Sequence, residues 1–158
     1  MCWFGERKHK RVAKEDIRCK KVFYRQPGHI RNRYVSPVMK TMYVQGQTYE
    51  SNIVLTCGTG YWKIDKGIHC YSMDKVKIER GIAQCGERLI AKIPFATDKY
   101  GNRHYLCTYY GNDIGMQAVV LECIIPKGSV YYENLGGEIV TEKLIIGEEI
   151  TKIDNYKQ

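Results

Sequence analysis

The sequence lacks paired cysteines, long apolar runs and the short motifs of common enzyme classes. Its seven cysteines, at positions 2, 19, 57, 70, 85, 107 and 123, include no C-x-x-C pair, and zinc sites usually have such spacing. No stretch approaches the roughly 18 apolar residues that a membrane-spanning helix needs. No phosphate-loop, H-E-x-x-H or G-x-S-x-G motif is present. We therefore expect no bound metal, no membrane partner and no motif-defined catalytic centre.

The order of residues near the N-terminus argues against export. Met1 to Glu6 runs directly into the basic stretch Arg7–Arg11, whereas a secretory signal places its charge before an apolar run. We expect a cytoplasmic protein, in which cysteines stay reduced. Several of them lie inside apolar runs, such as Cys123 in Leu121–Ile125, where a thiol behaves as a small hydrophobic group.

The charge of the chain is strongly positive. The formal net charge is +8, and basic residues concentrate between Arg7 and Arg33. Such a field attracts phosphates and nucleic acid. No recognised nucleic-acid module accompanies it, so a small phosphorylated ligand is the first expectation and nucleic acid the second. A solubilising surface with a charged arm is the simpler alternative.

The pattern of apolar residues predicts an α+β protein that is mostly β. We expect a basic lead-in over residues 1–14 and one globular domain over 15–158, a length that can bury a substantial core. One main helix is expected over residues 73–85, with Ser72 as its N-cap. The sheets are expected to be mixed or antiparallel, with strands at Ile17–Phe23, Leu89–Phe95, Tyr105–Tyr109 and Ala118–Ile125.

A candidate binding site follows from the end of one strand. A strand that ends at Tyr71 and a helix that begins at Ser72 would leave backbone N–H groups free for an anion. Tyr71 would supply a flat face for a base or nicotinamide, and His69 a hydrogen-bond donor or a general base. The alternative for His69 is a structural histidine at a strand end.

Two further residues complete the candidate site. Arg25 stands at the end of the first strand, where its charge would favour a phosphate. Glu142 precedes the apolar run Leu144–Ile146, where its carboxylate would accept ribose hydroxyl protons. The alternative for Glu142 is a solvent-facing glutamate beside Lys143.

Four segments resemble uncharacterised small proteins of gut bacteria and their phages. These segments span Ala13–Val22, Tyr43–Tyr49, Gly67–Tyr71 and Glu122–Ser129, and the resemblance covers most of the chain. This resemblance implies a shared fold and an origin in gut bacteria or their phages, but it implies no activity.

A more distant resemblance is to the ADP-ribosyltransferase fold. It rests on Tyr24–Arg25, on Gly67–Ser72 running into the expected helix, and on a Pro126–Gly128 turn followed by Glu142, in that order. The middle segment has no Ser-Thr-Ser, and Val140 stands two residues before Glu142, where arginine-modifying members have Glu or Gln. The resemblance implies a pocket for NAD or another nucleotide, with transfer chemistry in doubt.

Three classes of function are therefore weighed. The first is non-enzymatic binding of an NAD-like or cyclic nucleotide, with no cofactor required, by a phage-type protein that sequesters a host signal. The second is an active NAD-dependent ADP-ribosyltransferase with Arg25, His69 or Tyr71, and Glu142 in its pocket, in which Glu142 and His69 are the candidate catalytic residues. The third is a protein-interaction module, which an exposed tyrosine face on an open sheet edge would favour.

Overall fold

The computed structural model describes residues 3–25, 32–36, 41–58, 61–80, 94–106 and 117–151. The chain forms two compact units, each assembled from three segments. Unit 1 comprises Met1–Lys21, Gly46–Lys75 and Glu122–Gly147, and unit 2 comprises Val22–Gln45, Val76–Leu121 and Glu148–Gln158. No helix in the described part of the chain is long and apolar enough to cross a membrane.

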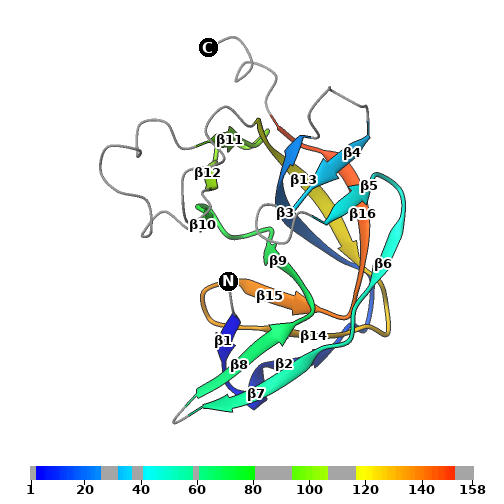
Figure 1. The fold of residues 1–158 in the computed structure, drawn as a ribbon, viewed down its shortest axis with the longest axis vertical. Helices are drawn as coiled ribbons and strands as arrows, with labels where there is room; N and C mark the ends of the chain where they lie inside the picture. Colours follow the sequence, from blue (N-terminus) through cyan, green and yellow to red (C-terminus); the bar gives the residue numbers. More distant parts are fainter. Residues whose placement is uncertain are drawn as a thin grey trace. The chain divides into compact units, whose positions relative to one another are not determined.

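Unit 1 is built from short antiparallel strands (Figure 1). One sheet has the order β1-β8-β7, and a second runs β2-β14-β15-β9 and continues into the first part of β3. The elements of this unit are β1 (Trp3–Gly5), the 3-10 helix η1 (Arg7–His9), β2 (Lys10–Val12), β6 (Thr48–Glu50), β7 (Val54–Gly58), β8 (Tyr61–Lys66), β9 (Ile68–Ser72), β14 (Val130–Glu133) and β15 (Glu138–Thr141). Three strands carry residues of both units: β3 (Ile17–Arg25), β13 (Ala118–Ile125) and β16 (Lys143–Glu149).

The core of unit 1 contains Trp3, close to the N-terminus. This side chain is buried with Ile64, Tyr132 and Val140, and its ring meets Tyr132 edge-on at a centroid distance of 5.8 Å. The indole N–H donates to the carbonyl of Glu138 at 2.8 Å, so the polar end of the ring is satisfied. The lead-in predicted over residues 1–14 is therefore ordered between residues 3 and 12, because Trp3 brings β1 into the core.

Unit 2 contains the remaining short strands. They are β4 (Arg33–Val35), β5 (Met42–Val44), β10 (Glu79–Arg80), β11 (Phe95–Thr97) and β12 (Arg103–Leu106). Strands β3, β4 and β5 pair in sequence and are antiparallel, and the ring of Phe23 contacts those of Tyr34 and Tyr43. Strand β12 lies between β11, which is antiparallel to it, and β10, which is parallel.

The mostly β prediction is confirmed, but the predicted helix is wrong where it can be compared. Residues 73–80 form a turn, an irregular stretch and β10, while residues 81–85 lie outside the described residues. The reason is tertiary pairing: Ile78 N–H donates to His104 and Tyr105 N–H donates to the Ile78 carbonyl, which draws this segment onto β12. These hydrogen bonds to β12 outweigh the weak helical propensity of residues 73–80.

The predicted strands are confirmed to different extents. β13 has the predicted bounds, and β3 extends two residues beyond Phe23. Strand β12 covers only the first part of the predicted Tyr105–Tyr109, and residues 107–109 lie outside the described residues. Most of the predicted strand Leu89–Phe95 also lies outside them, with β11 beginning at Phe95.

Candidate functional site

Strand β9 places His69 and Tyr71 on one face and Ser72 on the other. In the pairing with β15, His69 lies opposite Val140 and Tyr71 opposite Glu138. Successive side chains of a strand point to opposite faces, so Ser72 cannot join the other two. The Tyr71 side chain is also buried, which leaves little of its ring available to stack on a base.

Ser72 begins a turn rather than a helix. Its hydroxyl accepts from the N–H of Asp74 at 3.3 Å, and its carbonyl accepts from the N–H of Lys75 at 3.1 Å. These bonds resemble the first bonds of a capped helix, but the chain does not continue as one. The backbone donors expected to bind a phosphate at Ser72 are therefore not provided by a helix N-terminus.

Glu142 completes the ladder between β14 and β15. Its carboxylate accepts from the N–H of Val130 at 2.8 Å, and its own N–H donates to the Val130 carbonyl at 3.1 Å. β15 ends at Thr141, one residue before Glu142. The Glu142 carboxylate thus accepts from the Val130 N–H in the way that a backbone carbonyl would if the ladder continued. Glu142 has a structural role in this arrangement, whatever else it contacts.

Arg25 belongs to unit 2, whereas the other four predicted site residues belong to unit 1. Its guanidinium forms an ion pair with Glu149 at 2.6 Å and donates to the side chain of Gln117 at 3.0 Å. Glu149 also accepts from the hydroxyl of Tyr34 at 3.1 Å. The positive charge of Arg25 is therefore already balanced by a carboxylate.

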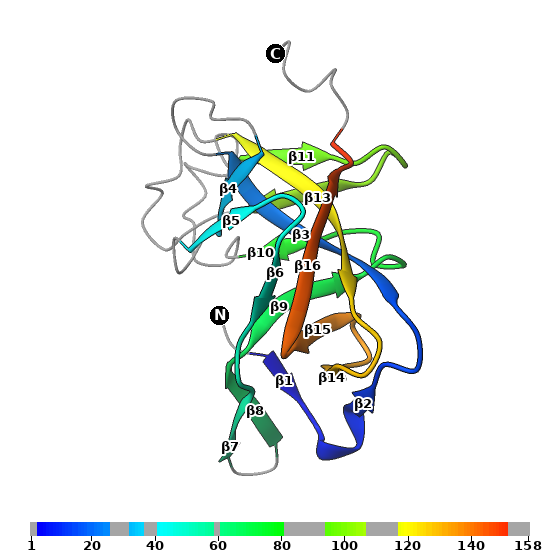
Figure 2. The ribbon, with the colours of Figure 1, turned by 90° about the vertical axis from the view of Figure 1, so that its right-hand side faces the viewer.

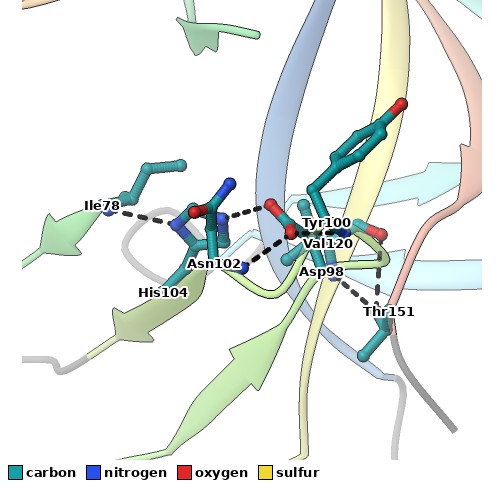
Figure 3. Close-up of polar contacts among 7 residues, drawn as sticks. All are labelled: Ile78, Asp98, Tyr100, Asn102, His104, Val120 and Thr151. Atoms are coloured by element: carbon teal, nitrogen blue, oxygen red, sulfur yellow. Dashed lines mark hydrogen bonds and ion pairs between the residues drawn. The ribbon is translucent and has the colours of Figure 1, made fainter. Parts of the chain in front are cut away.

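A buried polar cluster in unit 2, drawn in Figure 3, was not predicted from the sequence. The side chains of Asp98 and His104 are fully buried and meet at 2.9 Å between Oδ2 and Nε2. His104 Nδ1 accepts from the N–H of Ile78 at 3.1 Å. Because Nδ1 is an acceptor, the ring proton lies on Nε2 and is donated to Asp98. Both ring nitrogens are thus engaged.

Asp98 also fixes the turn between β11 and β12. Its other oxygen accepts from the N–H groups of Tyr100 and Asn102, both at 3.0 Å. Burial acts to raise the pKa of Asp98, but the hydrogen bonds from His104, Asn102 and Tyr100 prevail and hold it below its usual value. The pair therefore serves as a cross-link of β10, β12 and the turn rather than as a general acid and base.

Three buried thiols form a second polar cluster, in unit 1. Cys19, Cys70 and Cys123 are free and almost fully buried. A hydrogen bond with Cys70, together with burial, raises the pKa of the Cys19 thiol, and burial raises that of Cys123 to about 12. Within the described residues, no group of three or more potential ligands is arranged to hold a metal ion. The thiols of Cys19 and Cys123 therefore have little nucleophilic character at neutral pH.

The exposed polar residues of unit 1 have a different arrangement. We define the basic edge as the strand β2, Lys10–Val12, which is labelled in Figure 2. All three of its side chains are exposed. Strand β2 pairs with β14 on one side, and none of the described strands pairs with it on the other. Residues 8–14 carry four cations and no carboxylate.

The backbone register shows which groups of the basic edge face outward. Val12 lies opposite Val130, whose N–H and carbonyl both bond to Glu142, away from β2. In an antiparallel pair such positions alternate with positions that bond across the ladder. The N–H groups of Lys10 and Val12 therefore point away from β14, and those of Arg11 and Ala13 point toward it, as the bond from Ala13 to Ser129 shows.

Comparisons with known proteins add no functional assignment to these geometries. No family model, curated protein sequence or solved structure matches the chain.

Proposed function

We propose that the protein is a non-enzymatic interaction module that captures an extended acidic segment of another protein. The segment adds as a further strand beside the basic edge, a recognised mode of peptide binding. The observation that carries this proposal is that β2 is the last strand of its sheet among the described strands, with Lys10, Arg11 and Val12 all exposed.

The chemistry of the edge favours a peptide over a nucleic acid. Val12 directs both an N–H donor and a carbonyl acceptor outward, and a peptide strand supplies the matching acceptor and donor. Phosphate oxygens only accept hydrogen bonds, so a phosphate can pair with the outward N–H of Val12 but not with its carbonyl. Lys10 and Arg11 attract acidic side chains and speed association. The exposed Val12 side chain adds an apolar contact.

Catalysis is less well supported, because the candidate groups already have structural partners. Glu142 bonds to Val130, and Asp98 and His104 bond to each other at full burial. The nucleotide-binding interpretation stays a prediction. Its main physical argument, a helix beginning at Ser72, does not apply to the turn observed there.

Two variants test strand addition directly. Val12→Pro removes one outward N–H but leaves the ladder with β14 intact, because proline is tolerated at an edge where the N–H faces solvent. Val12→Thr is the matched control, since it keeps the N–H and a β-branched side chain. The probe is a fluorescent peptide, Glu-Val-Glu-Val-Glu-Val-Glu, which reads the same in both directions.

We expect the peptide to bind the unmodified protein and Val12→Thr with affinities within about threefold. Val12→Pro should bind at least about tenfold more weakly, which corresponds to the net worth of about one hydrogen bond. Equal affinity for Val12→Pro and the unmodified protein would exclude strand addition. A fluorescent oligothymidine that binds all three proteins equally, while the peptide binds none, would instead identify a phosphate-binding surface.

A further inference from the structure

We infer that the partner segment runs antiparallel to β2 and presents an apolar residue followed by two acidic residues. This inference rests on the proposed function and specifies the partner that the same edge selects. It follows from the order of side chains along the basic edge and from the backbone groups that remain open there.

The side chains of the basic edge are asymmetric along the strand. Lys10 and Val12 stand on one face of β2, opposite Tyr132 and Val130, while Arg11 stands on the other face, opposite Tyr131. Side chains directly opposite one another in an antiparallel pair contribute to pairing, with opposite charges and apolar pairs favoured. The partner residue beside Val12 should be apolar, and those beside Arg11 and Lys10 should be acidic.

The open backbone groups favour the antiparallel direction. An antiparallel partner residue beside Val12 can exchange both hydrogen bonds with it, whereas a parallel partner spreads slanted bonds over neighbouring residues. The edge offers few such positions, because the Lys10 carbonyl already accepts from the Arg11 guanidinium at 3.2 Å. Val12 is thus the main position at which a partner strand can bond. In the antiparallel direction, one partner residue bonds to both the N–H and the carbonyl of Val12, which suits a strand of only three residues.

The surroundings of Arg11 support an acidic residue in the middle of the segment. Burial raises the pKa of Tyr131 and that of Glu133, and the nearby positive charge of Arg11 only partly opposes this. The Arg11 guanidinium also donates to the Lys8 carbonyl at 2.7 Å. This bond orients the guanidinium, while the Arg11 side chain stays exposed. A carboxylate placed next to it on the added strand would meet an oriented donor.

Direction can be tested with two peptides of identical composition. The first is Ser-Thr-Val-Glu-Glu-Thr-Ser, and the second is its reverse, Ser-Thr-Glu-Glu-Val-Thr-Ser. In the antiparallel register, the first pairs valine with Val12 and glutamate with Lys10, whereas the second exchanges these pairs. The middle glutamate meets Arg11 in both. Two cross-strand pairs therefore differ, and we expect the first peptide to bind about three- to tenfold more tightly.

An exchange of two side chains in the protein provides the matched control. The double variant Lys10→Val/Val12→Lys keeps the composition, the net charge and the backbone of the edge, and both positions are exposed. We expect this variant to prefer the second peptide by a similar factor. A preference that reverses with the exchange cannot come from net charge or peptide composition.

Each other outcome has a distinct meaning. Preference of the unmodified protein for the second peptide would show a parallel partner and overturn the inference. Equal affinity for both peptides, with both weakened by Val12→Pro, would overturn the register and direction while strand addition stands. If neither these peptides nor the alternating Glu-Val peptide binds, the proposed function itself fails.

Discussion

In the basic edge of unit 1, charged side chains and outward backbone groups face solvent, whereas around Asp98 in unit 2 the polar groups face one another. Lys10 and Arg11 are exposed. Asp98 and His104 are fully buried, and Asp98 accepts three hydrogen bonds. A buried polar group without a partner is costly, so the second arrangement is a structural requirement. Exposed charges cost little, so they can be retained for binding.

This comparison predicts that substitutions at Asp98 have the largest effect on stability. Asp98→Ala leaves the ring N–H of His104 and the N–H groups of Tyr100 and Asn102 without their acceptor. We expect a loss of about 3–5 kcal/mol in the free energy of unfolding, as when one partner of a buried pair is removed. Urea unfolding measures it, with the exposed Lys99→Ala as the control. A loss below about 1 kcal/mol would show that the pair is not a structural cross-link.

Glu142 should show a smaller effect that depends on its oxygen rather than its charge. Glu142→Ala removes the acceptor of the Val130 N–H, and we expect a loss of about 1–2 kcal/mol. Glu142→Gln keeps a side-chain carbonyl and should retain most of the stability. If Glu142→Gln is as unstable as Glu142→Ala, the negative charge of Glu142, and not only its hydrogen-bond acceptor, stabilises this part of the fold.

The pH dependence of stability should depend on Asp98. Its pKa is lowered in the folded protein, so this carboxylate stabilises the fold above its unfolded pKa of about 3.9. That contribution is lost as the pH falls from there through the folded pKa. Urea midpoints are measured from about pH 6 to about pH 2, a range that spans the unfolded pKa. They should fall less steeply with decreasing pH for Asp98→Asn than for the unmodified protein. Identical slopes for the two proteins would contradict the assignment.

Charge reversal in the basic edge should have the smallest effect on stability. Lys10→Glu/Arg11→Glu changes two exposed side chains, and such surface substitutions usually alter stability by less than about 0.5 kcal/mol. The same variant should lose binding of the acidic peptide. A large loss of stability would mean that these residues hold β2 in place. Loss of peptide binding by this variant could then reflect unfolding, and only Val12→Pro and Val12→Thr would test binding.

The extent of prediction from sequence differed between long and short elements. Strand β13 follows from a nearly continuous apolar run, and β3 follows from apolar residues distributed along Ile17–Arg25. The expected helix failed because Ser72 and Asp74 can cap a turn as well as a helix. Only the distant pairing of Ile78 with His104 and Tyr105 decides between the two.

The basic edge could not be identified from local pattern for a similar reason. Three residues, Lys10–Val12, show no alternation that distinguishes a strand from a charged arm. Their pairing depends on β14, more than a hundred residues later in the chain. Trp3 was the available signal, because a tryptophan so close to the N-terminus suggests a segment that returns to a core.

The most direct test of the account is amide hydrogen exchange across the basic edge, with and without the alternating Glu-Val peptide. In the free protein, the amides of Arg11 and Ala13 should exchange slowly, while those of Lys10 and Val12 exchange rapidly, because only the first two bond to β14. At saturating peptide, the amide of Val12, and with it that of Lys10, should become protected. Rapid exchange of Val12 that persists at saturation would show that the peptide binds without adding a strand, and would contradict the proposed function.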